Sequence, residues 1–465
     1  MLSRIFLFSS LALSTIAVSV VNTTYEYIVV GSGPGGGPLA ANLARAGHSV
    51  LLLEAGDDQG DNPNISQIIN FNKAANDPLT RWDFFVKHSD DPARDLKYLH
   101  MVWRKADGEF YVGNSPPSDA KQLGIWYPRA GTLGGCAVHN AGVSANPPDA
   151  DWDHIAEITG DDSWSAKNMR KHLLKIENAS YAPNDKDHGH DGYLTLTQGQ
   201  INVSNGSDGG AMVQALANAI GQSGVSAQEL LKRDMNANDP NRDTSTGIFG
   251  QLRHADSQGR RVGTNTYIRA TLNDPAKYPL TVQLHSLVTK VLFSNSSLAP
   301  TAVGVEYLEG ASLYSADPRY NASTKRIVKQ VFASREVIVA GGVFNTPQIL
   351  KLSGIGPAEE LKKFKIPVVV DSPGVGTRLA DNYETSIISL GARDLKDAQG
   401  TYAVMLKSSI TNSTRDLYLF CGTFSFEGYW PGLVDSIHLP DLLSLSLIGS
   451  LQNTAIANMN VLWST

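Results

Sequence analysis

A glycine-rich turn between two apolar runs most constrains what this chain can fold into. The run over residues 27–30 leads into Gly31, Ser32, Gly33 and Gly36. A second apolar run, over residues 50–53, ends on Glu54, 23 positions after Gly31. The residues between the turn and the second run are predicted to be helical. Strand, turn, helix, strand and acid in this order predict a βαβ unit that binds a dinucleotide.

Each conspicuous residue of this unit has a predicted role. Gly31 permits the tight turn, Gly33 lets the backbone approach the pyrophosphate, and Gly36 lets the helix pack closely on the strand. Ser32 lies inside the turn, where free N–H groups of the helix N-terminus attract phosphate. Glu54 can accept hydrogen bonds from a ribose diol, and its charge would repel a 2′-phosphate. NAD and FAD both remain open on these residues alone.

Length and charge narrow the class of protein. With 465 residues the chain can form a large core, and two domains are expected. The formal net charge is -6, and lysine and arginine form no long runs, so nucleic acid is not an expected partner.

The N-terminus predicts export. Residues 1–19 combine the positive Arg4, a mainly apolar stretch and the small residues Ala17 and Ser19, which is typical of a secretory signal peptide. The stretch is too short and too rich in serine for a stable membrane anchor. We therefore expect a secreted, extracellular glycoprotein. Eight Asn-x-Ser/Thr acceptors start at Asn22, Asn64, Asn178, Asn202, Asn205, Asn295, Asn321 and Asn412.

Neither a disulfide framework nor a metal site is predicted. Cys136 and Cys421 are the only cysteines; they could pair, but a chain of this size needs no disulfide scaffold. His188 and His190 stand between two aspartates, a pattern that suggests a metal. A polar turn is the favoured interpretation, because no third group of ligands accompanies them.

Residues 57–125 are polar and rich in aromatic side chains, with weak periodicity, and are expected to form a long surface excursion. A lid over a binding site and a wrap around a sheet edge both remain open. Further elements follow from periodicity: helices at 151–176, 210–221 and 346–352, strands at 192–200 and 279–309, and a hairpin-like pair at 326–342 that ends in a buried strand.

Several segments together resemble the glucose–methanol–choline (GMC) oxidoreductases, in particular secreted, fungal-type members. They occur in the family's order: the first fingerprint up to Gly56, Leu-Gly-Gly-x-x-x-His-Asn at 133–140, Arg-Val-Gly-Thr-Asn-Thr-Tyr at 261–267, Ala-Val-Gly-Val-Glu-Tyr at 302–307, the segment 342–357 with Ser-Gly-Ile-Gly, and Pro-Gly-Val-Gly at 373–376. Gly131, Cys136 and Val343 depart from the usual family residues, which leaves the subfamily open.

The resemblance implies FAD as cofactor and an α/β fold. A discontinuous Rossmann-like FAD-binding domain would take residues 24–150 and 250–375. A substrate-binding domain with a mainly antiparallel sheet and helices would take 151–249 and 376–465, and would be incomplete. The resemblance also places Cys136, His139, Asn140, Ala141 and Gly142 along the flavin, and the backbone of Val288 at the adenine.

The most specific expectation concerns a covalent bond between His139 and the flavin. In choline-oxidase-like relatives with this loop, the corresponding histidine holds the flavin covalently. The alternative is a histidine that packs beside the ring without a bond.

The implied reaction is oxidation of a small-molecule alcohol to a carbonyl, with hydride transfer to flavin N5 and O₂ or another electron acceptor. We assign no catalytic residue. The family's histidine pair would lie beyond Thr465, the last histidine (His438) does not match its pattern, and 454–462 resembles the start of a substrate-domain strand. The sequence therefore indicates a C-terminally truncated family member. An inactive flavin-binding fragment or pseudoenzyme is the main alternative, and an NAD-dependent dehydrogenase is disfavoured by the later loops.

Overall fold

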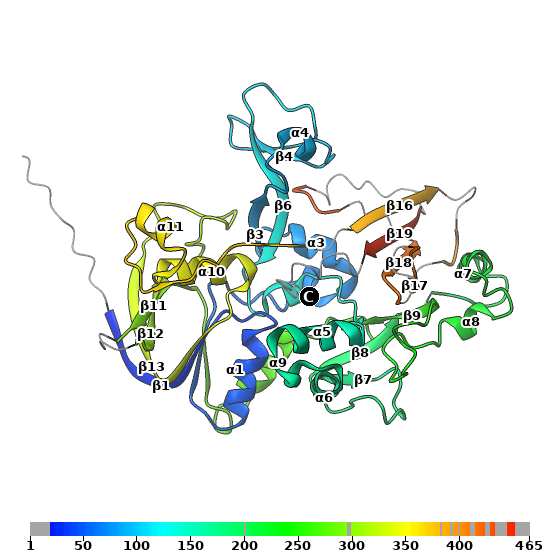
Figure 1. Ribbon diagram of the computed structural model, residues 1–465, viewed down its shortest axis with the longest axis horizontal. Coiled ribbons are helices and arrows are strands. Elements are labelled where there is room, and N and C mark those ends of the chain that lie inside the picture. Colours follow the sequence, from blue (N-terminus) through cyan, green and yellow to red (C-terminus); the bar gives the residue numbers. More distant parts are fainter. Residues whose placement is uncertain are drawn as a thin grey trace, which may run out of the picture.

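The computed structural model describes residues 19–451 apart from 200, 295–298, 382–383, 391–392, 394, 399, 410–413, 424–427 and 433–443. Within these residues the chain has an α/β fold with a six-stranded sheet, a seven-stranded sheet and a four-stranded sheet that projects from the molecule (Figure 1). Almost all of the expected signal peptide, His438 and the expected strand at 454–462 lie outside the described residues.

The six-stranded sheet contains the predicted βαβ unit. Its order is β10-β2-β1-β13-β12-β11, with β10, β2, β1 and β13 parallel and the last three strands antiparallel. The strands are β1 (Ser19–Val30), β2 (Val50–Leu53), β10 (Leu280–Gln283), β11 (Ser286–Phe293), β12 (Ala302–Glu309) and β13 (Ile327–Val339). The associated helices are α1 (Gly36–Arg45), α9 (Thr264–Leu272) and α10 (Gly342–Leu352). After α10 follow β14 (Ile355–Gly356), α11 (Ala358–Lys363) and β15 (Val370–Asp371).

Side chains on both faces of this sheet are buried. In β1, Ile28 and Val30 belong to one hydrophobic cluster, whereas Val29 belongs to the cluster on the other face. A strand covered on both sides needs apolar residues at every position. This explains the unbroken apolar run in front of Gly31.

The prediction of a hairpin-like pair of strands at 326–342 is wrong. The segment forms a single strand of 13 residues, β13, whose first part pairs antiparallel with β12 and which runs parallel to β1. Its pairing with β1 shifts register between Ala333 and Glu336, so the exposed Ser334 and Arg335 belong to a bulge. These polar residues imitate a turn in the sequence.

The seven-stranded sheet is mainly antiparallel, as the fold prediction states, in the order β16-β19-β18-β17-β9-β8-β7. Its strands are β7 (Glu177–Ala179), β8 (Leu194–Gly199), β9 (Gly247–Arg253), β16 (Glu384–Leu390), β17 (Thr401–Leu406), β18 (Leu417–Thr423) and β19 (Ser444–Leu451). The neighbouring helices are α5 (Asp149–Thr159), α6 (Ala166–Ile176), α7 (Asp208–Ala219) and α8 (Ala227–Leu230).

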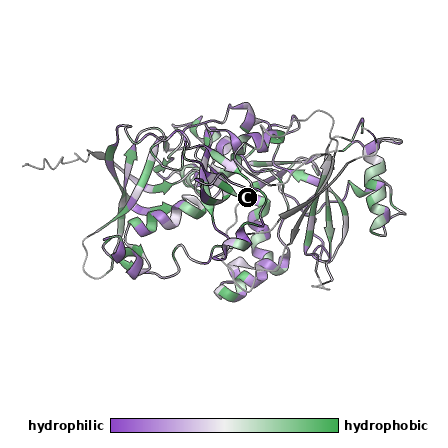
Figure 2. Ribbon diagram, turned by 90° about the horizontal axis from the view of Figure 1, so that it is seen from above, coloured by the Kyte–Doolittle hydropathy of each residue, from purple (hydrophilic) through white to green (hydrophobic). Residues whose placement is uncertain are grey.

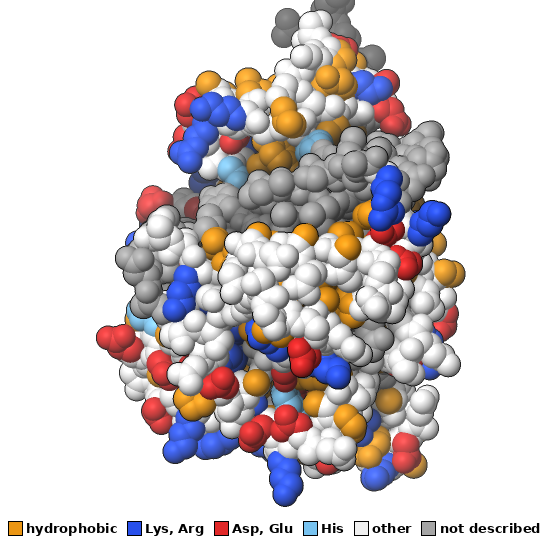
Figure 3. Space-filling view, turned by 90° about the vertical axis from the view of Figure 1, so that its right-hand side faces the viewer, with side chains coloured by type: hydrophobic (Ala, Val, Ile, Leu, Met, Phe, Trp, Pro, Cys, Tyr) orange, Lys and Arg blue, Asp and Glu red, His pale blue; other side chains and the backbone are white. Residues whose placement is uncertain are grey.

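Helices α7 and α8 build a separate core with this second sheet. Val213 of α7 and Leu230 of α8 are buried with Ile248, Tyr402 and other strand residues. Seen from above, the two large sheets lie toward opposite ends of an elongated molecule, and the mainly hydrophobic α7 lies at its far right (Figure 2). On the face of Figure 3, side chains of both charges are interspersed.

Residues 57–130 form a β arm rather than an irregular excursion. Its sheet has the order β3-β6-β4-β5 and stands away from the two larger sheets (Figure 1). Between α4 and β4 of this arm, the His100 ring stacks on Trp430 with the ring centroids 3.9 Å apart. The arm therefore contacts the segment that follows β18. It comprises α2 (Pro63–Ser66), α3 (Phe71–Asn76), β3 (Arg81–Val86), α4 (Pro92–Asp95), β4 (Val102–Arg104), β5 (Phe110–Val112) and β6 (Lys121–Ala130).

Candidate functional site

The connection pattern of the six-stranded sheet defines where a ligand can bind. Strand β1 lies between β2 and β13, and α1 and α10 begin just after β1 and β13. Ligands of open α/β sheets bind at the carboxyl ends of the strands where the strand order reverses. The end of β1 is therefore the candidate site, with two helix N-termini directed at it.

The three glycines of the turn differ in what surrounds them. A Cβ atom at Gly31 would lie 2.4 Å from the backbone oxygen of Ala340, and its φ of +94° also favours glycine. A Cβ atom at Gly36 would lie 2.1 Å from the backbone oxygen of Gly31. At Gly33 the nearest atom would be the Cα of Gly135, at 3.8 Å. Gly31 and Gly36 thus permit backbone packing, whereas Gly33 faces open space.

Hydrogen bonds to the Glu54 carboxylate stabilise this turn. The Ser32 hydroxyl donates to Glu54 Oε2 at 2.5 Å, and the backbone N–H of Ser32 donates to the same oxygen at 3.1 Å. The other oxygen, Oε1, accepts from the backbone N–H of Gly56 at 2.9 Å. Burial raises the pKa of Glu54, and these hydrogen bonds oppose that shift. A carboxylate has about four acceptor sites, so one remains for a ligand.

The second glycine-rich segment, around the 3₁₀ helix η2 (Gly135–Val138), lies directly against the first. The Gly134 N–H donates to the Ser32 hydroxyl at 3.0 Å. A Cβ atom at Gly135 would lie 2.6 Å from the Cα of Gly33, so Gly135 has no room for a side chain on this side. The two segments predicted from sequence to hold a dinucleotide therefore meet at Gly33 and Gly135.

His139 follows η2 and is buried without a hydrogen-bond partner for its Nε2 atom in the described part of the chain. Burial, together with the positive charges of Arg129 and Arg261, lowers the pKa of His139 to about 3. The imidazole is therefore neutral at physiological pH. A buried polar atom left unpaired costs free energy, which indicates that a further group belongs next to Nε2.

Arg261, the first residue of the segment 261–267, is a candidate site residue to which the sequence analysis gave no role. Its guanidinium donates from Nη1 to Asn140 Oδ1 at 2.7 Å and to the backbone oxygen of Ala137 at 3.2 Å. Its Nε donates to the backbone oxygen of Ile65 at 3.2 Å. Burial lowers the pKa of Arg261 to about 10, which still leaves it positively charged at neutral pH. The sequence feature that could have identified Arg261 is its position directly before the Val-Gly-Thr-Asn segment.

The remaining predicted residues lie along the same path. Ala141 and Cys136 are half-buried, and Gly142 is buried with a φ of +64°. Val288 is buried in β11, which begins beside Glu54 because the Ser286 N–H donates to the Glu54 backbone oxygen at 2.8 Å. The structure thus brings the turn from Gly31 to Gly36, Glu54 and the segment that starts at Gly134 together, and Val288 lies two residues after Ser286, which contacts Glu54.

Other sequence features have structural explanations. Cys136 and Cys421 are both free. His188 is buried between two carboxylates, and no cluster of three or more His, Cys, Asp or Glu side chains in the described residues could hold a metal ion. Among the described helices, none has the length and apolar character required to cross a membrane.

The sequence profile described as GMC oxidoreductase matches residues 25–384. The chain belongs to the GMC oxidoreductase family. Among its curated relatives is the oxygen-dependent choline dehydrogenase of Pseudomonas savastanoi pv. phaseolicola, which is 31% identical over 363 residues, or 77% of this chain and 53% of the relative. The corresponding enzyme of Pseudomonas fluorescens is 31% identical over 362 residues, with the same coverage. The chain spans about half the length of the curated relatives it matches.

Solved structures of low sequence identity share the fold. A formate oxidase variant from Aspergillus oryzae aligns with a TM-score of 0.64 and 17% identity over 94% of this chain and 73% of that chain. Pyridoxine 4-oxidase from Mesorbium loti aligns with a TM-score of 0.61 and 16% identity over 92% of this chain and 71% of that chain.

GMC oxidoreductases bind FAD, and the residues present fit this cofactor. The open direction above Gly33 suits a pyrophosphate, and the acceptor site left on Glu54 suits a ribose hydroxyl. The unpaired Nε2 of His139 and the cationic Arg261 lie further along the path, where a flavin ring would follow.

Proposed function

We propose that this protein is an FAD-dependent oxidoreductase that oxidises the CH–OH group of a small-molecule alcohol to a carbonyl. The observation that carries the proposal is the contact of the two glycine-rich segments at Gly33 and Gly135, at the carboxyl edge of a Rossmann-like sheet in a GMC family member. FAD supplies the hydride acceptor, N5 of its ring. O₂ or another electron acceptor then receives the electrons.

The chain's own residues would bind and orient the cofactor. The N–H groups at the start of α1, behind Gly33, would bind the pyrophosphate, and Glu54 would accept from the ribose. The backbone of Val288 would contact the adenine. At the other end, the Asn140 amide and the backbone at Ala141 and Gly142 would donate toward the ring. Residues 24–150 and 250–375 would form the FAD-binding domain; 151–249 and 376–465 would belong to a substrate-binding domain.

Anaerobic spectroscopy tests this function. The purified protein should show flavin absorbance, and the band should bleach when an alcohol that it oxidises is added. Choline should be included with aryl and alkyl alcohols, because the similar Pseudomonas proteins are choline dehydrogenases. Bound flavin that no alcohol bleaches would favour an inactive flavin-binding protein. A preparation that takes up no FAD would rule the proposal out.

We also infer a covalent link between His139 and the flavin. The neutral imidazole has an Nε2 atom without a hydrogen-bond partner among the described residues, as a nucleophile toward the 8α carbon requires. The new N–C bond would replace one C–H bond of the 8α methyl group, with loss of its proton, and the two electrons released would pass through the flavin to O₂ or another electron acceptor. After denaturation and gel filtration, the yellow colour should stay with the polypeptide. In His139→Ala it should elute with the small molecules. Release of all flavin from the unsubstituted protein would exclude the bond and leave His139 as a packing residue.

Secretion with N-glycosylation is a further part of the proposal. Asn202, Asn205 and Asn321 are exposed acceptors among the described residues. When a eukaryotic host expresses the chain, we expect protein in the medium that lacks residues 1–19. Asn321→Gln should remove one glycan, seen as a mass difference that disappears after enzymatic deglycosylation. Retention in the cell with an intact N-terminus would contradict this localisation.

A further inference from the structure

Arg261 is a buried cation without a counter-charge among the described residues. It is 5% exposed, and its hydrogen-bond partners are two backbone oxygens and one amide oxygen. Its Nη2 atom has no partner there. Tyr429 is the titratable group that favours its charge, and a phenol is neutral at physiological pH. A buried charge in this state is costly unless an anion accompanies it in the working protein.

A second buried arginine shows what the usual compensation looks like. Arg242 is 6% exposed, but its Nη2 atom lies 2.5 Å from Asp149 Oδ1 and 3.3 Å from Asp243 Oδ1. Arg415, which also has an unpaired nitrogen, lies near the same two carboxylates, which favour its charge. Arg261 differs from both, because its partners are the backbone oxygens of Ile65 and Ala137 and the amide oxygen of Asn140, with no carboxylate among them.

Arg261 also fixes the orientation of the Asn140 amide. A guanidinium can only donate hydrogen bonds, so the atom of Asn140 at 2.7 Å from Nη1 must be the amide oxygen. The amide NH₂ group therefore points away from Arg261. Asn140 presents two donors on its free side.

The position of Arg261 along η2 decides which part of the cofactor it affects. Gly134 and Gly135, at the start of this segment, contact Ser32 and Gly33 in the phosphate-binding turn. Arg261 contacts Ala137 and Asn140 at the opposite end. A dinucleotide lying along the segment would thus have its phosphates at the start and its ring at the end.

We propose that Arg261 is a positioning residue for the flavin ring, which directs the Asn140 donors toward the ring and supplies the positive charge that compensates the negative charge of the reduced ring. This inference rests on the proposed function. Preorganised donors and a nearby cation stabilise developing negative charge without a cost of reorganisation. The flavin should therefore be easier to reduce than it would be without Arg261.

The midpoint potential of the bound flavin tests this role, measured in the full chain against a redox dye at equilibrium. In Arg261→Met, the equilibrium constant for reduction should fall at least tenfold, which is about 30 mV for a two-electron couple. Arg261→Lys keeps the charge but loses the fixed donor geometry of the guanidinium, so its equilibrium constant should fall less than that of Arg261→Met. Asn140→Leu should lower the constant as well, and its effect should not add to that of Arg261→Met, because contacting residues are coupled.

Arg242→Met is the matched control. It should lower the melting temperature, because it removes the cation that forms ion pairs with both Asp149 and Asp243, and should leave the flavin potential unchanged. An unchanged potential in Arg261→Met, or additive effects of the Arg261 and Asn140 substitutions, would overturn the positioning role. If Arg261→Met failed to fold, the comparison of Arg261→Lys with Asn140→Leu would still decide. Absence of flavin from the unsubstituted protein would be visible before any variant is compared, and would reject the proposed function itself.

Discussion

Gly36→Ala should be among the most damaging single substitutions in this protein. The added Cβ atom would lie 2.1 Å from the Gly31 backbone oxygen and 3.0 Å from the Ala340 side chain. Both neighbours belong to the ends of buried parallel strands, which cannot shift cheaply. Overpacking typically costs about 1–3 kcal/mol of unfolding free energy, and a contact with main chain this close places Gly36→Ala at the upper end of that range. Urea unfolding should show a lower midpoint, with FAD bound weakly if at all.

Gly33→Ala separates binding from folding at the same turn. Its Cβ atom would meet nothing closer than 3.8 Å. The unfolding free energy of the apoprotein should therefore change by less than about 1 kcal/mol. FAD affinity should nevertheless fall at least tenfold in an equilibrium titration, because the new methyl group points where the pyrophosphate would approach. Equal stability losses in the two alanine variants would refute this division of roles between Gly33 and Gly36.

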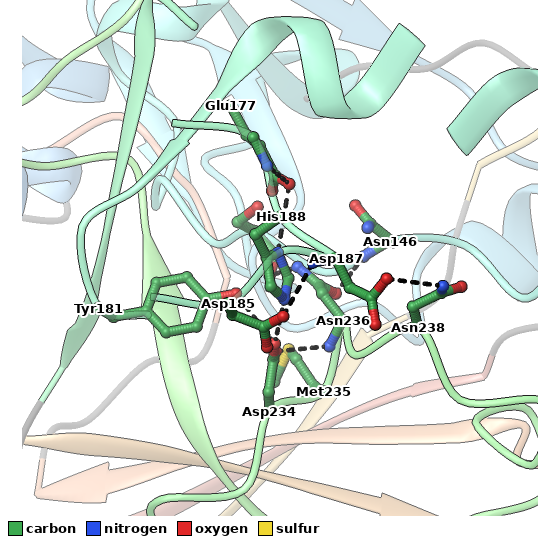
Figure 4. A network of polar contacts seen from close by, with 12 residues as sticks. Asn146, Glu177, Tyr181, Asp185, Asp187, His188, Asp234, Met235, Asn236 and Asn238 are labelled. Carbon is green, nitrogen blue, oxygen red and sulfur yellow. Dashed lines mark hydrogen bonds and ion pairs between the residues drawn. The ribbon is translucent and has the colours of Figure 1, made fainter. Parts of the chain in front are cut away.

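His188→Gln should destabilise the second sheet and its neighbouring loops. His188 lies between Glu177 Oε1, 3.2 Å from Nδ1, and Asp234 Oδ2, 2.8 Å from Nε2 (Figure 4). Asp234 also accepts from the Tyr181 hydroxyl at 3.0 Å. Removing the imidazolium leaves two largely buried acids facing each other without a cation. Loss of one partner from a buried ion pair costs about 3–5 kcal/mol, and urea unfolding at pH 6 should show a loss in this range.

The pH dependence identifies the origin of this loss. Hydrogen bonds to Asp234 and Glu177 raise the pKa of His188 to about 10, above its unfolded value. Its contribution is therefore fully present below about pH 6.5 and is lost as the pH rises toward 10. Burial alone would raise the pKa of Asp234, but hydrogen bonds from His188 and Asn236 outweigh burial and lower it. The contribution of the Asp234 carboxylate to the unfolding free energy is therefore lost as the pH falls below about 4.

The stability difference between the unsubstituted protein and His188→Gln should thus be largest between about pH 4 and 6.5. His190→Gln is the control, since His190 is exposed two residues away and should change little at any pH. A difference that stays constant from pH 5 to pH 10 would show that the charge of His188 is not what matters.

The sequence predicted the parts of this protein whose geometry depends on short patterns. Gly31, Gly36 and Glu54 have fixed spacings because one turn and one helix separate them, and local chemistry determines such distances. The two apolar strands on either side of this turn and helix followed in the same way. The prediction was wrong at 334–335, where a bulge with exposed polar residues imitates a turn.

Contacts between distant segments were not predictable. The approach of Arg261 to Asn140 joins residues 121 positions apart, and no periodicity encodes it. The same holds for His188, whose partners Glu177 and Asp234 come from different loops and strands; the local His-Gly-His pattern suggested a metal or a turn instead. The β arm escaped prediction partly because its strands β4 and β5 have only three residues each, too few for a visible alternation.

The meeting of Gly33 with Gly135 has a consequence for how such an enzyme diversifies. At this point main chain packs against main chain, so substitutions at other positions leave the contact unchanged, and a side chain added at Gly33 or Gly135 would alter it. Substitutions in the proposed substrate-binding domain could therefore change which alcohol is bound without changing this part of the dinucleotide site. Engineering that targets a different cofactor would have to rebuild the backbone here, whereas engineering of substrate choice would not.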